Sequence, residues 1–146
     1  MRGLSGRTAR VAAAVCLLGL AGAAGIGAAG ARRASMHEAG VTMQGLWAGI
    51  LAGKPAASLA GQARWLAAWA EHLPALFPPG SDTGATYALP TIWSDPQGFA
   101  ARVAALRRAT RAMAVAGEAG DQKRFGAAFR ATDDACGACH RVYRHR

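Results

Sequence analysis

The chain has 146 residues, which is enough for one domain and an export segment, and 52% of them are hydrophobic. Alanine is abundant and strand-forming residues are few, so the composition favours helices packed on helices. The formal net charge is +9, but the basic residues outside the N-terminal leader are scattered and lack interleaved aromatic residues, which argues against binding to nucleic acid.

The N-terminal segment has the pattern of a secretory signal. Residues Met1 to Arg10 contain three arginines and no acidic residue, and Val11 to Ala31 carry no charge. We interpret residues 1–23 as a cleaved signal peptide, with cleavage possible up to residue 31, followed by a domain over 32–146. The alternative is an uncleaved anchor, because 21 uncharged residues can just span a bilayer, although a stretch so rich in Gly and Ala makes a weak span. The mature form is therefore expected to contain no membrane span.

Two amphipathic segments come first in the expected domain. Helical spacing of apolar residues predicts one helix from about Arg32 to Leu51, which ends at Gly53-Lys54-Pro55. The same spacing predicts a second helix from about Ser58 to Leu76, in which Pro74 kinks or tightens the last turns. The connection from Phe77 to Ser94 is longer than the usual bundle loop, so we expect it to pack over the bundle or to cross its end.

The third helix begins at Ser94-Asp95-Pro96-Gln97, where either Ser94 caps with Gln97 or Asp95 caps with Pro96 in the first helical position. Glycines at 117 and 120 end it, and Asp121 is a suitable cap for the fourth helix. A core-facing seam at helical spacing then runs along the fourth helix through Phe125, Phe129, Thr132, Cys136, Cys139 and Tyr143. Four helices with one long connection predict an all-α fold, an antiparallel four-helix bundle.

The seam runs into Cys136-Gly137-Ala138-Cys139-His140, the C-x-x-C-H pattern of covalent c-type haem attachment. The two thiols add to the haem vinyl groups and the imidazole of His140 ligates the iron. On a helix these three residues share one face. A redox-active dithiol does not require a histidine at this position. A zinc site would need two more ligands, and the one remaining cysteine, Cys16, lies in the leader. We therefore expect one covalent haem c, attached near the C-terminus.

Three stretches together resemble the cytochrome c′ family of class II c-type cytochromes. They are the C-x-x-C-H-x-x-Y-R ending at Cys136–Arg144, the I-W-S-D entry at Ile92–Asp95 with Phe99, and the pair Arg32-x-x-x-Met36. The resemblance covers residues 32–146. It implies that Cys136 and Cys139 form the thioethers and that His140 is the proximal iron ligand. It also implies that Arg144 lies beside this imidazole, that Arg32 lies near a haem propionate, and that Met36 packs over the distal face of the iron.

The resemblance further implies a periplasmic protein with a five-coordinate iron that binds nitric oxide and carbon monoxide but forms no stable oxygen adduct. Electron transfer is also expected, with a basic surface that steers acidic redox partner proteins. Many family members are homodimers through their first two helices, where Trp47, Trp65 and Trp69 lie in this sequence, either in such a face or in the core. The chain offers no distal acid–base pair, so we expect it not to be an enzyme.

One alternative stays open, a six-coordinate, low-spin electron carrier with a first-helix methionine as the sixth iron ligand. Met36 and Met43 are seven residues apart and share a helix face, so helical geometry does not say which of them approaches the haem. His37 is adjacent to Met36, but we expect it to be exposed and to point away from the haem face. We expect His72 and His145 to be surface residues.

Overall fold

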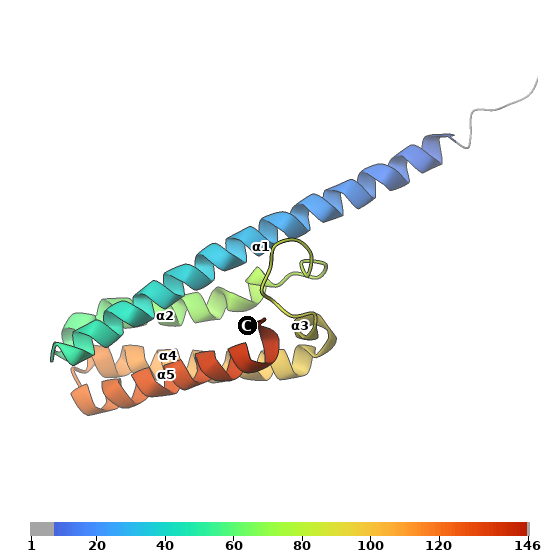
Figure 1. Ribbon diagram of the computed structural model, residues 1–146. Helices are drawn as coiled ribbons and strands as arrows, with labels where there is room; N and C mark the ends of the chain where they lie inside the picture. The colour runs from blue at the N-terminus through green and yellow to red at the C-terminus, as the bar shows by residue number, and fades with distance from the viewer. Residues whose placement is uncertain (1–7, 146) are drawn as a thin grey trace, which may run out of the picture.

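The computed structural model describes the backbone of residues 8–145 and the side chains of residues 27–145. Figure 1 shows four long helices, α1 (Thr8–Leu51), α2 (Ala56–His72), α4 (Pro96–Glu118) and α5 (Gln122–Tyr143). Two short elements, the 3₁₀ helix η1 (Leu73–Leu76) and the helix α3 (Thr91–Ser94), lie between α2 and α4. The described part of the chain forms no strand beyond one isolated bridge, so the all-α prediction is confirmed.

Helix α1 begins earlier than the sequence suggested. The predicted start at Arg32 is wrong, since the helix runs without interruption from Thr8. The physical reason is that the leader is rich in Ala, the strongest helix former, and that no proline separates it from the helix that follows. Residues 1–7 of the expected signal peptide lie outside the described residues, and of residues 8–26 only the helical backbone is described. Among the described residues, no helix is both long and apolar enough to cross a membrane.

At other helix ends, the proline and the capping residues have the effects that the sequence predicted. Pro74 lies in η1, so the tightening predicted for the end of the second helix is confirmed. At the start of α4, the Asp95 side chain accepts a hydrogen bond from Gly98 N at 3.0 Å, which selects the Asp95 cap with Pro96 in the first position. At the start of α5, Asp121 accepts from Arg124 N at 2.9 Å. These side-chain acceptors satisfy backbone donors that have no partner within the helix.

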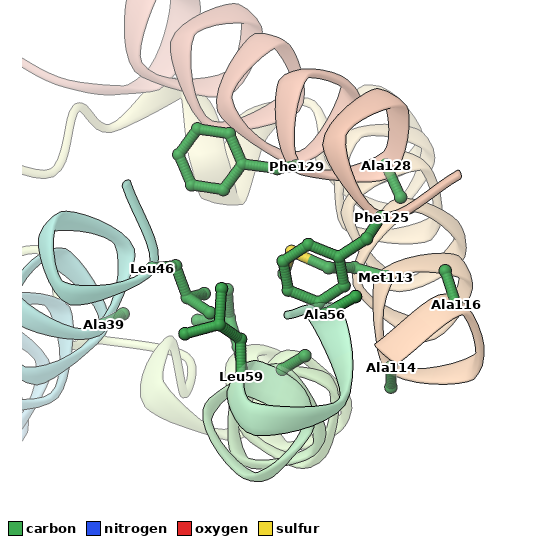
Figure 2. Close-up of a cluster of buried hydrophobic side chains, with 12 residues drawn as sticks. Ala39, Leu46, Ala56, Leu59, Met113, Ala114, Ala116, Phe125, Ala128 and Phe129 are labelled. Carbon is green, nitrogen blue, oxygen red and sulfur yellow. The ribbon is translucent and has the colours of Figure 1, made fainter. Parts of the chain in front are cut away.

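The core lies where the four long helices meet, at the end of the bundle that contains the α1–α2 and α4–α5 turns. Figure 2 shows one cluster of buried side chains to which every long helix contributes, including Leu46, Leu59, Met113 and Phe125. Leu46, Met113 and Phe125 are fully buried. A second cluster, nearer the haem motif, is built on Ala70, Leu73, Val103 and Leu106, and Met36, Phe77, Phe99 and Cys136 pack against it.

The seam predicted along α5 is a core seam. Phe125, Phe129, Thr132 and Tyr143 are buried, and Cys136 and Cys139 are half-buried. Helix α4 packs about equally on α5 and on α2, whereas α1 packs mainly on α2 and much less extensively. Side chains facing the space between α1 and α5 are therefore left to line cavities.

Candidate haem-binding site

The C-x-x-C-H motif lies near the C-terminal end of α5, and the last residue of this helix, Tyr143, is three positions after His140. Cys136, Cys139 and His140 are all half-buried and lie within about one turn of the helix, as their spacing predicts. Cys136 packs against the second core cluster, while Cys139 and His140 line a cavity of about 550 Å³. The motif thus lies at the boundary between the core and an open space.

Four parts of the chain border this cavity: α1, the connection between η1 and α4, the first turn of α4, and the C-terminal end of α5. Its apolar wall contains Met36, Phe77, Ile92 and Phe99, and its polar lining includes arginines and histidines. Among the described residues that line it, three are arginines, three are histidines and none is acidic: Arg32, Arg33, Arg144, His37, His140 and His145. Apolar walls with cations around them suit a flat apolar macrocycle that carries two carboxylates.

The structure separates the two candidate methionines. Met36 lines the cavity that contains His140, and it packs against the second core cluster. Met43 lies two helical turns further along α1, where it packs against the first cluster and lines a different cavity of about 590 Å³ together with Phe129. Only Met36 therefore shares a cavity with the expected proximal ligand.

The positions of the three histidines outside the motif agree only partly with the prediction from the sequence. His37, His72 and His145 are exposed, as the sequence suggested. However, His37 and His145 also line the same cavity as His140, so the expectation that His37 points away from the haem face is not what the structure shows. The reason is that α1 packs only lightly on its neighbours, which lets residues adjacent to Met36 border the open space.

Arg32 is almost fully buried, with 3% of its surface exposed, and its guanidinium holds the long connection against α1. It donates to Leu76 O at 3.0 Å, to Ser81 O at 3.0 Å and to Thr86 Oγ1 at 2.7 Å. It also lies over the ring of Phe77, 4.9 Å from the centroid. Arg32 thus lines the cavity, and its hydrogen bonds hold the connection in place.

The C-terminal end of α5 is fixed from two sides. Backbone hydrogen bonds run from Leu89 N to Tyr143 O at 3.0 Å and from His145 N to Tyr87 O at 2.8 Å, on either side of an antiparallel bridge between Ala88 and Arg144. Figure 1 shows the C-terminus beside the connection that leads to α3. The Tyr143 hydroxyl also donates to Asp95 Oδ2 at 2.7 Å, which ties the end of α5 to the cap of α4.

Burial shifts the pKa values of the three motif side chains. It raises the pKa of the Cys136 thiol to about 11, with smaller contributions from the charges of Asp133 and Cys139. Burial also raises the pKa of the Cys139 thiol, opposed by the nearby charge of Arg102. The pKa of His140 is lowered, first by burial and then by the charge of Arg144. A neutral imidazole is the form that donates a lone pair to a metal, so these surroundings favour ligation by His140.

Several cavity residues were not predicted from the sequence. Thr86, Tyr87 and Ala88 come from the long connection, and Arg33 is adjacent to Arg32 on α1. No local sequence pattern predicts the path of a connection of this length, so the sequence did not show that its residues line the cavity. Phe99 was visible as part of the I-W-S-D…F stretch and does line the cavity.

The residues present fit a covalently attached haem c. Two thiols and an imidazole project from one part of α5, and the adjoining cavity combines apolar walls with cations that can pair with propionates. The zinc alternative lacks support, because no group of three or more His, Cys, Asp and Glu in the described part of the chain could hold a metal ion.

Comparison with known proteins gives the same result. The sequence profile of the family described as Cytochrome C' matches residues 28–144. The cytochrome c' of Pararhodospirillum photometricum is 33% identical over 115 residues, which cover 77% of this chain and 92% of the relative. The cytochrome c-554 of Cereibacter sphaeroides is 34% identical over 99 residues, which cover 66% of this chain and 60% of that relative's length.

Solved structures share the fold. Cytochrome c prime from Shewanella frigidimarina has a TM-score of 0.77 and 31% identity, covering 84% of this chain and 97% of the other. A ferrous variant of cytochrome c prime from Alcaligenes xylosoxidans with bound NO has a TM-score of 0.74 and 26% identity, covering 82% of this chain and 94% of the other. Because the family profile spans most of the sequence and the fold agrees, this chain belongs to the cytochrome c′ family and binds haem c, with its iron, covalently.

Proposed function

We propose that this protein is a periplasmic haem c protein whose five-coordinate iron binds nitric oxide and carbon monoxide and exchanges electrons with redox partner proteins. In this proposal an antiparallel four-helix bundle carries the haem near the C-terminus. The observation that supports it best is the shared cavity, in which Met36 of α1 lines the same space as His140 of α5. The nitric oxide complex of the Alcaligenes relative supports the gas-binding part.

This proposal assigns a specific role to each site residue. Cys136 and Cys139 hold the haem, and the neutral imidazole of His140 ligates its iron from one side. The haem supplies an iron that accepts diatomic ligands and one electron. Arg144 keeps a positive charge beside His140, where it lowers the pKa of the imidazole and tunes its basicity.

In this proposal helix α1 would cover the side of the iron opposite His140. Met36 presents a flexible apolar side chain that excludes water and offers no N–H or O–H donor. From Met36, therefore, a polar oxygen adduct would gain no hydrogen bond, whereas nitric oxide and carbon monoxide need none. Arg32 forms part of the wall, and its charge attracts a propionate while its hydrogen bonds retain the connection.

A gas titration tests this proposal. The ferrous holoprotein should bind carbon monoxide and nitric oxide with full conversion of the optical spectrum, and equilibration with oxygen should produce no stable adduct. Met36→Ala should accelerate carbon monoxide binding by opening the pocket, while Met43→Ala, in the other cavity, should leave that rate unchanged. Failure of the wild type to bind either gas would contradict the proposal.

A second candidate function is that of a six-coordinate electron carrier with a methionine ligand. The same observation keeps it in view, since the Met36 thioether borders the space that an iron ligated by His140 would face. Met43 is the weaker candidate for this role, because it lines a different cavity. The two functions differ in spin state, which an optical spectrum reports.

Export and assembly complete the proposal. We propose that residues 1–23, or up to residue 31, are removed as a signal peptide, so native protein should lack this segment by mass spectrometry and appear in the periplasmic fraction.

We also propose a homodimer through α1 and α2, where Trp47 is 49% exposed and Trp65 is 40% exposed. Trp69 is half-buried and donates to Ser35 Oγ at 2.8 Å, so it belongs to the interior. Light scattering of the holoprotein tests the dimer. No catalytic activity is proposed.

A further inference from the structure

Gly40 lines the same cavity as His140 but contributes no side chain to it. On α1, the residues Arg33, Met36, His37 and Gly40 all line this cavity, and their spacing places them on one face of the helix. Gly40 comes one turn after Met36. Because Cα–Cβ bonds in a helix tilt toward its N-terminus, a side chain at position 40 would extend back toward Met36. The space beside Met36 therefore depends on which residue occupies position 40.

Packing against another helix explains two other glycines of α1 but does not explain Gly40. A Cβ at Gly45 would be 2.9 Å from Nε2 of Gln62, and one at Gly49 would be 2.6 Å from Cδ2 of Leu59. These two positions allow α2 to approach closely. Among the described residues, however, a Cβ at Gly40 would meet no atom within 4 Å outside its own stretch of backbone. A glycine inside a helix also lowers stability relative to alanine, so helix stability does not explain Gly40 either.

The place that Gly40 leaves free connects the cavity with the surface. Gly40 is exposed to solvent and also lines the cavity, whereas Met36, one turn earlier, is half-buried. An uncharged diatomic gas needs no polar partner on its way, only a gap between side chains. In the proposed function Met36 shields the iron, so a gap directly beside Met36 is a route to the shielded side.

We propose that Gly40 is a specificity-determining residue for gas binding, because its missing side chain leaves open the space beside Met36 through which a diatomic gas reaches the iron. This inference rests on the proposed function, since it concerns how the same gases enter. Met36 and Gly40 then act together: the thioether side chain narrows the distal space, and the glycine keeps it from closing. A larger residue at position 40 would crowd Met36 and exclude the gas.

A graded series at position 40 tests this inference, with carbon monoxide as the probe and stopped-flow spectroscopy of the ferrous holoprotein as the measurement. Gly40→Ala adds one methyl group that meets no neighbour, so the association rate constant should fall about twofold or less. Gly40→Leu should lower it about tenfold or more, because a branched side chain fills the space beside Met36. The matched control is Gly126→Leu on α5, where a Cβ borders the other cavity and would lie 3.8 Å from Arg130 Nη1, an ordinary contact. Its rate constant should stay within about twofold of wild type.

A double variant shows whether the two residues share one space. In the Met36→Ala background the distal space is already enlarged, so adding Gly40→Leu should slow carbon monoxide binding much less than it does in the wild type. Equal slowing in the two backgrounds would show that position 40 acts on gas entry without Met36, and would contradict the inference. Haem content and thermal unfolding of each variant identify misfolding, and Gly40→Val replaces Gly40→Leu if the leucine variant does not fold.

Two further results would rule the inference out. Binding of carbon monoxide to Gly40→Leu at the wild-type rate would mean that the gas does not pass this position. Loss of covalent haem in Gly40→Leu, with a wild-type rate in the fraction that retains haem, would mean that the macrocycle itself needs the space. If the wild type binds neither gas, the proposed function fails and this inference fails with it, whereas a wild type that binds gas beside an unresponsive Gly40 series contradicts this inference alone.

Discussion

The Tyr143 hydroxyl donates a hydrogen bond of 2.7 Å to Oδ2 of Asp95, the residue that caps α4 through its other carboxylate oxygen. One carboxylate therefore holds both the start of α4 and the residue three positions after His140. Gly98 makes this possible, because a Cβ there would collide with the Asp95 carboxylate and would stand 2.6 Å from the Tyr143 hydroxyl. This contact links the I-W-S-D stretch physically to the haem motif.

The first prediction concerns acid stability. The hydrogen bond from Tyr143, and then that from Gly98, lower the pKa of Asp95. A carboxyl whose pKa is lower in the folded state stabilises the fold above its unfolded pKa, and this stability is lost as the pH falls through the folded pKa. Asp95→Asn should therefore be less stable than wild type near pH 6, and the difference should shrink below about pH 4. Denaturant unfolding across this pH range measures it.

The control for this prediction is Asp82→Asn, an exposed carboxyl on the connection. It should track the wild type at every pH. Tyr143→Phe removes the donor and should reproduce part of the Asp95→Asn effect, with little further loss in the double variant, because the two residues share one contact. Additive losses in the double variant would show that the contact does not carry the effect.

The second prediction concerns the connection that Arg32 holds. Arg32→Ala removes charged hydrogen bonds to Ser81 and Thr86 and leaves a buried carbonyl without its donor, so unfolding should cost about 2–3 kcal/mol less. Arg32→Lys should rescue only part of this, since an ammonium cannot reproduce the planar fork. Limited proteolysis should then cut the connection faster in both variants. Arg33→Ala, at the adjacent exposed position, should do neither, and equal cleavage of this control would rule out the assigned role.

The third prediction concerns attachment. Replacing Cys136 or Cys139 with Ser should leave at most one thioether, and the yield of folded holoprotein should fall, because in the proposed attachment the haem would fill the cavity beside the core. Cys136→Ser should have the greater effect on stability, since Cys136 packs against the second core cluster whereas Cys139 faces the cavity. Haem staining after denaturing electrophoresis measures the attachment. Full covalent haem in the double variant would contradict the assignment.

Local signals predicted the elements that hold the motif. Asp121 caps its helix as predicted, and Asp95 is one of the two caps that the sequence left open; each side chain needs only a donor three residues away. The seam from Phe125 to Tyr143 follows from helical periodicity alone. The sequence could therefore place Cys136 and Cys139 at the edge of the core without knowledge of their neighbours.

Features that depend on distant contacts were not predictable in this way. The packing of α1 decides that Met36, and not Met43, shares a cavity with His140, although the two residues lie on one helix face. The partners of Arg32 lie 44 to 54 positions away in a connection without periodicity. The start of α1 was missed because the Ala-rich leader contains no proline before Arg32, and its glycines do not interrupt the helix.

The spin state of the resting ferric holoprotein tests the central claim most directly. If Met36 shields the iron without ligating it, the optical and electron paramagnetic resonance spectra should be those of a high-spin, five-coordinate haem, and Met36→Ala should leave them high-spin. The structure supplies the control in Met43→Ala, whose side chain lines the other cavity and should have no effect. A low-spin wild-type spectrum with a thioether-to-iron band that Met36→Ala abolishes would contradict the claim and identify an electron carrier.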